Sequence, residues 1–390
     1  MVFKSLSRTA LFGVAIAACV AGQASAADPI KIGGAFNLTG GQASLDGPAK
    51  NGAQMAIDAI NAAGGVNGRP LELVVYDGKT DPAIITSLAS QLINSDKVSA
   101  VIGFSDSDPV LALGPTAQKA GVPFVAVGAT SPKLPDQIGD HMFLACFGDN
   151  TQAAVGASFA ITELKAKTTY VLEDTANEYA TLLSKYFRET FEQLGGTVLG
   201  RDTYKTDDKS FAAQITKIKA SAQKPDFIYV AATPDTIGLI VRQIRQAGLK
   251  QPIVGGDGYD TPLLLEVAGA AANNVYYTTH SFITETSTGA IKTFYDAYKT
   301  AYGTAPENAF AALGYDAAML VADAIKRAGS DDPAKITTAL AETKDLPGIA
   351  GAISYAAGSR IPVKGVTVVG VKDKALYKAA ELVPTFVPAP

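Results

Sequence analysis

Residues 30–77 read IKIGGAFNLTGGQASLDGPAKNGAQMAIDAINAAGGVNGRPLELVVYD, and this stretch decides the fold class of the chain. The apolar residues 30–36 predict a buried strand, and residues 71–77 predict a second one. A helix is expected between them, beginning near Asp46 and ending at the glycine pair 64–65. One face of this helix carries Ala53, Ala56, Ile57 and Ile60. The order of strand, helix and strand predicts two parallel strands with a helix packed across them.

The same alternation continues along the chain and then restarts. In the first unit, further strands are expected at 98–104 and 122–127, with helices at 82–95 and up to Ala120. In the second unit, strands are expected at 168–174, 196–204, 225–233 and 252–257, with helices at 177–194, 209–221 and 234–247. Alternation of this kind predicts an α/β protein with two Rossmann-like, doubly wound lobes.

The tail of the chain does not predict a third domain. Two long helices are expected at 288–302 and 308–328, followed by strands at 351–355 and 363–371 that would join the earlier units. A chain that returns to both lobes crosses between them several times, which predicts a multi-strand hinge. The predicted lobes are residues 27–147 plus 281–353, and residues 148–280 plus 354–390.

Composition limits the class of protein. The chain has 390 residues, of which 47% are hydrophobic, and a formal net charge of −4. This length suffices for two domains with a core each, and the charge gives no indication of a nucleic-acid partner. Besides Cys19, the chain has one cysteine, Cys146, which we expect to be a buried structural residue without a disulfide partner.

The first 26 residues predict a secretory signal peptide. Lys4 and Arg8 are basic, residues 10–21 are apolar, and residues 24–26 form a small-residue cleavage site. We therefore expect a periplasmic protein that begins at residue 27. The alternative is a lipoprotein anchored through Cys19. No other apolar segment is long enough to span a membrane, so we expect the mature protein to be soluble.

The sequence offers little that points to catalysis. Its two histidines, His141 and His280, lie in unrelated contexts, and each is expected to be a surface or hydrogen-bonded residue. No nucleophile-elbow, phosphate-loop or dinucleotide-binding pattern is found. We expect no enzyme activity, no cofactor and no metal. A hydrolase using Ser107 or Ser131 would be the enzymatic alternative, but neither predicted strand end has a histidine nearby.

Small polar residues recur instead where predicted strands end. Ligands of open α/β sheets bind outside the carboxyl ends of the strands. Hydroxyls of Ser107 and Thr130, next to helix N-termini, suit a carboxylate, and Asp257 in the other lobe suits an ammonium group. Taken singly, each of these residues could be only a helix cap or a turn residue. Asp106 and Asp108 would oppose an anion here, so we expect them to cap the helix or to point to solvent.

Four blocks of the sequence carry a family resemblance. They are residues 30–82, which begin IKIGGAF, VIGFSDSD (101–108), GVPFVAVGATSPKL (121–134) and PIVGGDGYDTP (252–262). Through them the mature chain resembles the type I periplasmic solute-binding proteins, in particular the leucine/isoleucine/valine-binding branch of the ABC importers. The resemblance implies two lobes that close over a solute, and a membrane permease as partner.

The resemblance also implies roles for single residues. Ser107 and Thr130 would hold the carboxylate of an amino acid. In the turn that contains Thr130, the Gly128 carbonyl would help to bind the ammonium group, and Ala129 would add backbone contacts. Asp257 would take the ammonium group, and Tyr179 would close over the ligand. Leu45 and Thr233 stand where relatives have aromatic residues, so the contacts to the side chain of the solute differ.

The sequence therefore predicts an extracytoplasmic protein that captures a small amino acid, branched-chain or otherwise apolar, for an ABC importer. We expect it to be a monomer. The alternative within the same fold is an aromatic acid, an amide or a urea-type solute. A sensory ligand-binding domain is a further alternative, because folds of this kind also serve receptors.

Overall fold

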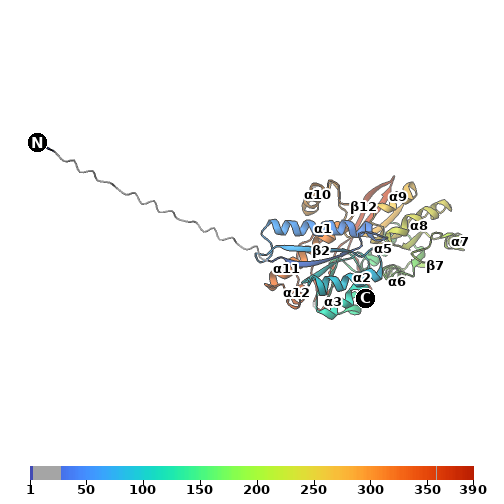
Figure 1. The fold of residues 1–390 in the computed structure, drawn as a ribbon. Helices are drawn as coiled ribbons and strands as arrows, with labels where there is room; N and C mark the ends of the chain where they lie inside the picture. The colour runs from blue at the N-terminus through green and yellow to red at the C-terminus, as the bar shows by residue number, and fades with distance from the viewer. Residues whose placement is uncertain (3–27, 357) are drawn as a thin grey trace.

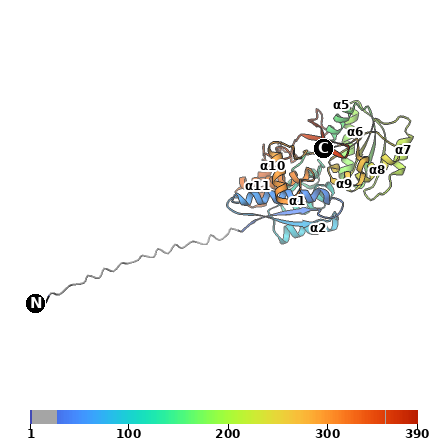
Figure 2. The ribbon, with the colours of Figure 1, turned by 90° about the horizontal axis from the view of Figure 1, so that it is seen from above.

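The computed structural model describes residues 1–2, 28–356 and 358–390. It consists of two lobes, each built on its own sheet (Figures 1 and 2). The strand order is β2-β1-β3-β4-β5 in the first sheet and β12-β11-β10-β9-β8-β6-β7 in the second. This confirms the predicted α/β fold with two doubly wound lobes. The predicted signal peptide and Cys19 lie outside the described residues.

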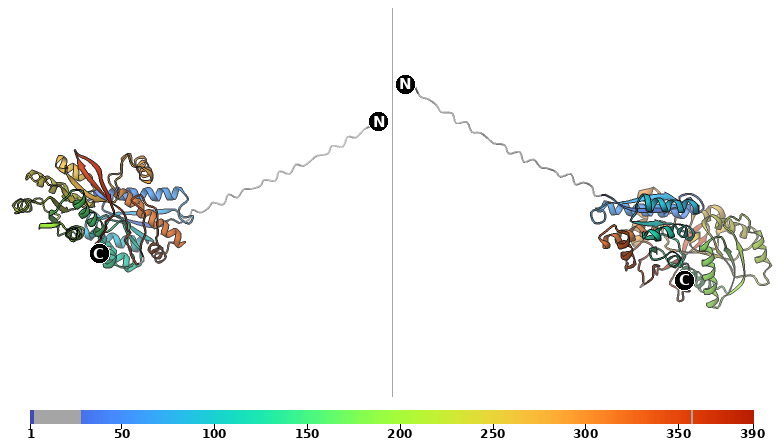
Figure 3. Two further views of the ribbon diagram at one scale, coloured as in Figure 1. Left: turned by 180° about the vertical axis from the view of Figure 1, so that it is seen from behind. Right: turned by 60° about the horizontal axis from the view of Figure 1, so that its bottom comes forward.

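The first lobe contains the strands β1 (Ile30–Phe36), β2 (Leu71–Asp77), β3 (Ala100–Gly103), β4 (Phe124–Ala126) and β5 (Met142–Leu144), all parallel. Its helices are α1 (Ala43–Ala62), α2 (Pro82–Ser90), α3 (Ser107–Ala120), α4 (Leu134–Ile138), α10 (Gly289–Tyr302), α11 (Phe310–Ala328) and α12 (Pro333–Ala341). The helices α10 and α11, in orange to brown tones, lie beside the blue helix α1 (Figure 3).

The second lobe contains the parallel strands β6 (Thr168–Asp174), β7 (Thr197–Tyr204), β8 (Phe227–Ala231), β9 (Ile253–Gly255) and β10 (Val275–Thr279). The last two strands, β11 (Val366–Lys372) and β12 (Ala375–Leu382), join it antiparallel. Its helices are α5 (Asp149–Thr162), α6 (Glu178–Gln193), α7 (Ala212–Ala220), α8 (Pro234–Gln246) and α9 (Pro262–Ala268).

Two predictions about single elements are wrong. Residues 351–355 do not form a strand, because only Ile353 pairs, in a single bridge with Leu346. The predicted helix 82–95 changes character after Ser90, where residues Gln91–Ser95 form a π-helical turn. The sequence did not predict the strands β5 and β10, the short helices α4, α9 and α12, or the edge strand β12.

Helices α1 and α11 pack very closely on one face of the first sheet. A Cβ atom on Gly52 of α1 would overlap the carbonyl oxygen of Ala311, and one on Gly314 of α11 would overlap that of Ala49. Each helix therefore places a glycine against the backbone of the other. This contact brings the start of α11, which carries Phe310, next to the start of α1.

The chain crosses between the lobes three times, and the three crossings meet. Phe147 of the first crossing stacks on His280 of the second, with ring centroids 4.0 Å apart. Lys364 of the third crossing donates to the carbonyl oxygen of Ala145 at 3.0 Å. Tyr355 still packs in the core of the first lobe, so the chain leaves that lobe later than the predicted boundary at residue 353.

Candidate functional site

A small gap of about 220 Å³ lies between the two lobes, where the carboxyl ends of both sheets face each other. Its lining residues are Gln42, Leu45, Ser105, Asp106, Tyr179, Thr233, Pro234, Asp257, Gly258 and Phe310. None of these described residues is a lysine or an arginine.

The lining residues come mostly from the beginnings of helices. Gln42 precedes α1, Asp106 caps α3, Tyr179 lies in the first turn of α6, Thr233 precedes α8 and Phe310 begins α11. The first N–H groups of a helix lack partners within it and carry a partial positive charge. The gap is therefore surrounded by positive helix ends, although no cationic side chain lines it.

Half of the predicted site residues line this gap. Leu45 comes from the first lobe, whereas Tyr179, Thr233 and Asp257 come from the second. The Tyr179 hydroxyl accepts a hydrogen bond from the N–H of Gly258 at 3.0 Å. Its own hydrogen is therefore free to be donated to a bound molecule.

The other four predicted residues, Ser107, Gly128, Ala129 and Thr130, lie behind the lining. Ser107 donates its N–H to the Asp106 carboxylate at 2.6 Å, and its hydroxyl oxygen accepts from the N–H of Ser131 at 3.2 Å. Thr130 donates its hydroxyl to Asp149 at 2.7 Å. In the closed arrangement these groups are thus paired with other protein groups.

The turn at residues 128–130 packs tightly against its surroundings. A Cβ atom on Gly128 would overlap the ring of Phe310, so a glycine is required there. The Ala129 carbonyl accepts a hydrogen bond from the Cys146 thiol at 3.2 Å. Cys146 is fully buried, as expected, and burial raises the pKa of its thiol.

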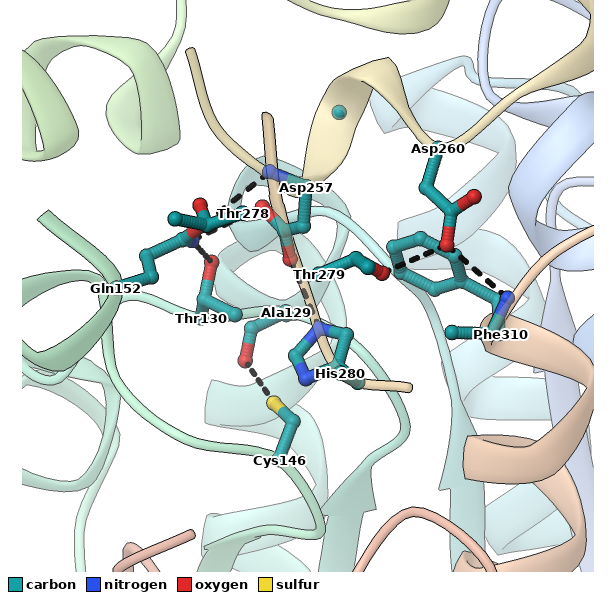
Figure 4. Close-up of polar contacts among 12 residues, drawn as sticks. Ala129, Thr130, Cys146, Gln152, Asp257, Asp260, Thr278, Thr279, His280 and Phe310 are labelled. Carbon is teal, nitrogen blue, oxygen red and sulfur yellow. Dashed lines mark hydrogen bonds and ion pairs between the residues drawn. The ribbon is translucent and has the colours of Figure 1, made fainter. Parts of the chain in front are cut away.

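Asp257 is the centre of a buried hydrogen-bond network (Figure 4). One carboxylate oxygen accepts from Nε2 of Gln152, and the other lies 2.9 Å from Nε2 of His280. The same Gln152 nitrogen lies 3.0 Å from Asp149 and 3.4 Å from the hydroxyl oxygen of Thr130. Gln152 therefore connects the predicted carboxylate-binding turn of the first lobe to the predicted ammonium-binding residue of the second.

His280 acts here as a neutral hydrogen-bond donor. Burial lowers the pKa of His280, and the carboxylate of Asp257 only partly offsets this effect. A neutral imidazole that faces a carboxylate carries its hydrogen on the facing nitrogen, which is Nε2. The pair is therefore a hydrogen bond from a neutral donor and not an ion pair.

Asp106 does cap α3, but it does not point to solvent. It is 7% exposed and lies in the gap, where it accepts from Nε2 of Gln42 at 2.7 Å and from the side-chain amide of Asn177 at 3.1 Å. Burial raises the pKa of Asp106 to about 8, and the nearby Asp108 adds to this effect. The alternative that both acids face solvent is wrong, because closure of the lobes supplies donors from the other side.

The contact of Asp106 and Asp108 with α6 joins the two lobes directly. Asn177 donates its amide to both carboxylates, at 3.1 Å in each case. The N–H of Glu178 donates to Asp108 at 3.2 Å. We call this set of contacts the α6 latch, and it closes one side of the gap.

The sequence reading missed several residues of the site. Gln152 lies in the first turn of α5, and His280 follows the carboxyl end of β10. Both positions follow the general rule for open α/β sheets and could have been found from it. Gln42 and Phe310 gave no comparable signal, because they reach the gap only through the packing of α1 against α11.

Two further findings concern possible metal sites and membrane-spanning helices in the described part of the chain. Within it, no group of three or more His, Cys, Asp or Glu residues is arranged to hold a metal ion. Nor does that part contain a helix of the length and apolar character that crossing a membrane requires.

Comparison with known proteins gives consistent matches along the chain. Residues 29–375 match the family model described as periplasmic binding protein. The chain is 32% identical over 345 residues to the leucine-, isoleucine-, valine-, threonine-, and alanine-binding protein of Pseudomonas aeruginosa, covering 88% of this chain and 90% of that one.

Two solved structures resemble it over nearly their whole length. One is a leucine-binding protein from Thermotoga maritima, with 34% identity, a TM-score of 0.85 and coverage of 91% of this chain and 99% of that one. The other is a branched-chain amino acid transporter substrate-binding protein from Streptococcus pneumoniae in complex with isoleucine, with 34% identity, a TM-score of 0.84 and coverage of 92% and 100%.

Proposed function

The chain belongs to the periplasmic binding protein family, and from this premise we propose that it captures a small amino acid between its lobes and delivers it to an ABC importer. The relatives of more than 30% identity are named for leucine, isoleucine, valine, threonine or alanine. They favour a branched-chain or other small apolar amino acid over an aromatic acid. The protein acts in the periplasm as a monomer, binds its solute without turnover and docks on a membrane permease.

The observation that carries this proposal is the distribution of charge around the gap. Helix N-termini surround it, whereas its buried acid Asp257 has only neutral hydrogen-bond donors as partners. A carboxylate suits the helix N-termini, and an ammonium group suits Asp257. An amino acid carries both groups and therefore matches both sides of the gap.

The parts of the solute would be held as follows. Ser107 and Thr130 exchange some of their protein partners for the carboxylate, next to the backbone of Gly128 and Ala129. Asp257 accepts from the ammonium group, and Tyr179 donates its free hydroxyl hydrogen. Leu45 and Thr233 face the side chain of the solute.

Binding would proceed by closure of the lobes about the three crossings. The solute first meets the turn of the first lobe, and Tyr179 and Asp257 then arrive with the second lobe. Closure is favoured only by groups that bind the solute more tightly in the closed form. Asp257 is such a group, because it lies on the second lobe and is buried after closure.

The test is calorimetric titration of the mature protein, residues 27–390, with amino acids. Replacing Asp257 by Ala should weaken binding of an amino acid by roughly 2–4 kcal/mol, because a buried ammonium group loses its charged partner. The variant Asp257→Asn, which keeps the size of the side chain, should lose most of the same free energy.

A loss below about 0.5 kcal/mol in both folded variants would contradict the proposal, because a hydrogen bond to a charged group contributes more than that. The solute would then lack an ammonium group, and an amide, a urea or an aromatic acid would become the better candidate. The thermal midpoints of the variants, measured without solute, check that they are folded.

A further inference from the structure

The side chain of Gln42 has a definite orientation at the edge of the gap. It is 4% exposed, and its Nε2 donates to Asp106 at 2.7 Å. With its nitrogen on the carboxyl group of Asp106, the amide of Gln42 has its oxygen on the side away from this acid. The oxygen Oε1 must therefore point elsewhere.

This oxygen is buried and has no hydrogen-bond partner among the described residues. Gln42 is at the same time one of the residues that line the gap. Buried acceptors in proteins are nearly always paired, because an unpaired one loses its hydration without compensation. A donor on a bound solute would supply the missing partner.

The neighbouring polar groups are also acceptors. The hydroxyl of Thr233 donates its hydrogen to Asp235 at 2.7 Å, so its oxygen presents only lone pairs. The carboxylate of Asp106 lies beside Gln42 and also lines the gap. One side of the gap therefore presents acceptor oxygens from both lobes, those of Gln42 and Thr233, beside the carboxyl group of Asp106.

This side of the gap is not closed by an apolar wall. Gln42, Asp106 and Thr233 also line a second space of about 570 Å³ between the lobes. The α6 latch residues Asp108 and Asn177 also line this second space. Gln42, Asp106 and Thr233 therefore lie between two neighbouring spaces.

We propose that the gap selects, among small amino acids, those whose side chain ends in an O–H or N–H donor over aliphatic ones of the same shape. This inference rests on the proposed capture of an amino acid and departs from it in one respect, since it assigns a polar rather than an apolar side chain to the preferred solute. The donor of the solute bonds to Oε1 of Gln42, while its ammonium group bonds to Asp257.

Amino acids of equal shape provide the test. The side chains of leucine, asparagine and aspartate have the same branched skeleton. It ends in two methyl groups in leucine, in an amide in asparagine and in two carboxylate oxygens in aspartate. Valine and threonine differ by one methyl-for-hydroxyl exchange. In calorimetric titrations of the mature protein we expect asparagine to bind at least tenfold more tightly than leucine, and threonine more tightly than valine. Aspartate, which brings acceptors to acceptors, should bind most weakly.

The variant Gln42→Met tests whether the preference for a donor-bearing side chain depends on Oε1 of Gln42. Methionine has a similar length but no acceptor amide, so the variant should lose at least tenfold in affinity for asparagine and little for leucine. Gln54→Met, a change on the outer part of the same helix where the Gln54 amide contacts Asp58, should leave both affinities unchanged.

The outcomes separate the two proposals. If leucine binds more tightly than asparagine, or if Gln42→Met weakens both equally, the inference is overturned and the proposed function stands. If no amino acid binds the folded protein, the proposed function itself fails.

Discussion

At the scale of single residues, Asp106 shows how closure changes the surroundings of one side chain. It caps α3 in the first lobe and accepts from Asn177 in the second. Every partner of its carboxylate is a donor, yet burial disfavours the charge and raises the pKa to about 8. Protons should therefore bind to this acid in the folded protein at a pH where they leave it in the unfolded chain.

The variant Asp106→Asn tests this titration. An acid whose pKa is raised on folding stabilises the folded state at low pH, and this contribution is lost as the pH rises from about 4 to about 8. From pH 8 to pH 5 we expect the thermal midpoint of the solute-free wild type to rise relative to that of the variant, by roughly 3–8 °C.

Any loss of stability caused by the asparagine amide of the variant is the same at every pH. Only the change with pH in the difference between the two thermal midpoints is therefore informative. Differential scanning calorimetry at several pH values measures it. A difference that stays constant over this window would show that Asp106 keeps an ordinary pKa.

Some residues of the site could be predicted from the sequence and others could not, and the physical cause differs between residues. Tyr179, Thr233 and Asp257 follow strands, and the rule for strand ends brings such residues to one place. Gln42 precedes a helix that reaches the gap only through the packing of two distant segments. For Asp106, the sequence predicts only repulsion between its charge and a bound anion. The donor that Asp106 meets from the other lobe belongs to Asn177, and no local sequence pattern reveals this contact.

At the scale of elements, the close contact of α1 and α11 depends on small residues. We expect Gly52→Ala to lower the free energy of unfolding by roughly 2–4 kcal/mol, because the added Cβ overlaps a backbone carbonyl that cannot move by itself. Urea denaturation of the mature protein measures this change.

Gly47 in the same helix provides the matched control. A Cβ atom there would meet nothing within 4 Å, so Gly47→Ala should be neutral or stabilise by up to about 1 kcal/mol. Equal destabilisation by both substitutions would mean that the glycines matter for some reason other than the helix contact.

Most strands of the parallel core of each lobe followed from the sequence, whereas β5, β10 and the edge strand β12 did not. Strands buried on both faces are short apolar runs, and β1, β3 and β6 stand out for this reason. The strand β12 has mostly exposed residues, and its pairing with β11 depends on segments already folded. Residues 351–355 are apolar because Ile353 and Tyr355 pack against the first lobe, not because they form a strand.

At the scale of the whole molecule, the α6 latch joins the two lobes at one edge of the gap. The variant Asn177→Ser keeps an N-cap for α6 but removes the amide that reaches Asp106 and Asp108. We expect the solute-free variant to be more open, with a larger radius of gyration in small-angle X-ray scattering. Because closure is part of binding, its affinity for the solute should fall by about 3- to 10-fold.

Gln137→Ala serves as a control, since its contact with Glu178 across the same edge is exposed and long, at 3.4 Å. If Asn177→Ser and the wild type scatter identically and bind equally, the latch contributes nothing to closure.

The buried position of Cys146 has a practical consequence for optical sensors. A chain that starts at residue 27 has this single sulfhydryl, and its placement beneath the 128–130 turn, with a raised pKa, keeps it unreactive toward maleimide dyes. A fluorophore can therefore be attached through a new cysteine at the rim of either lobe while the native one is left in place.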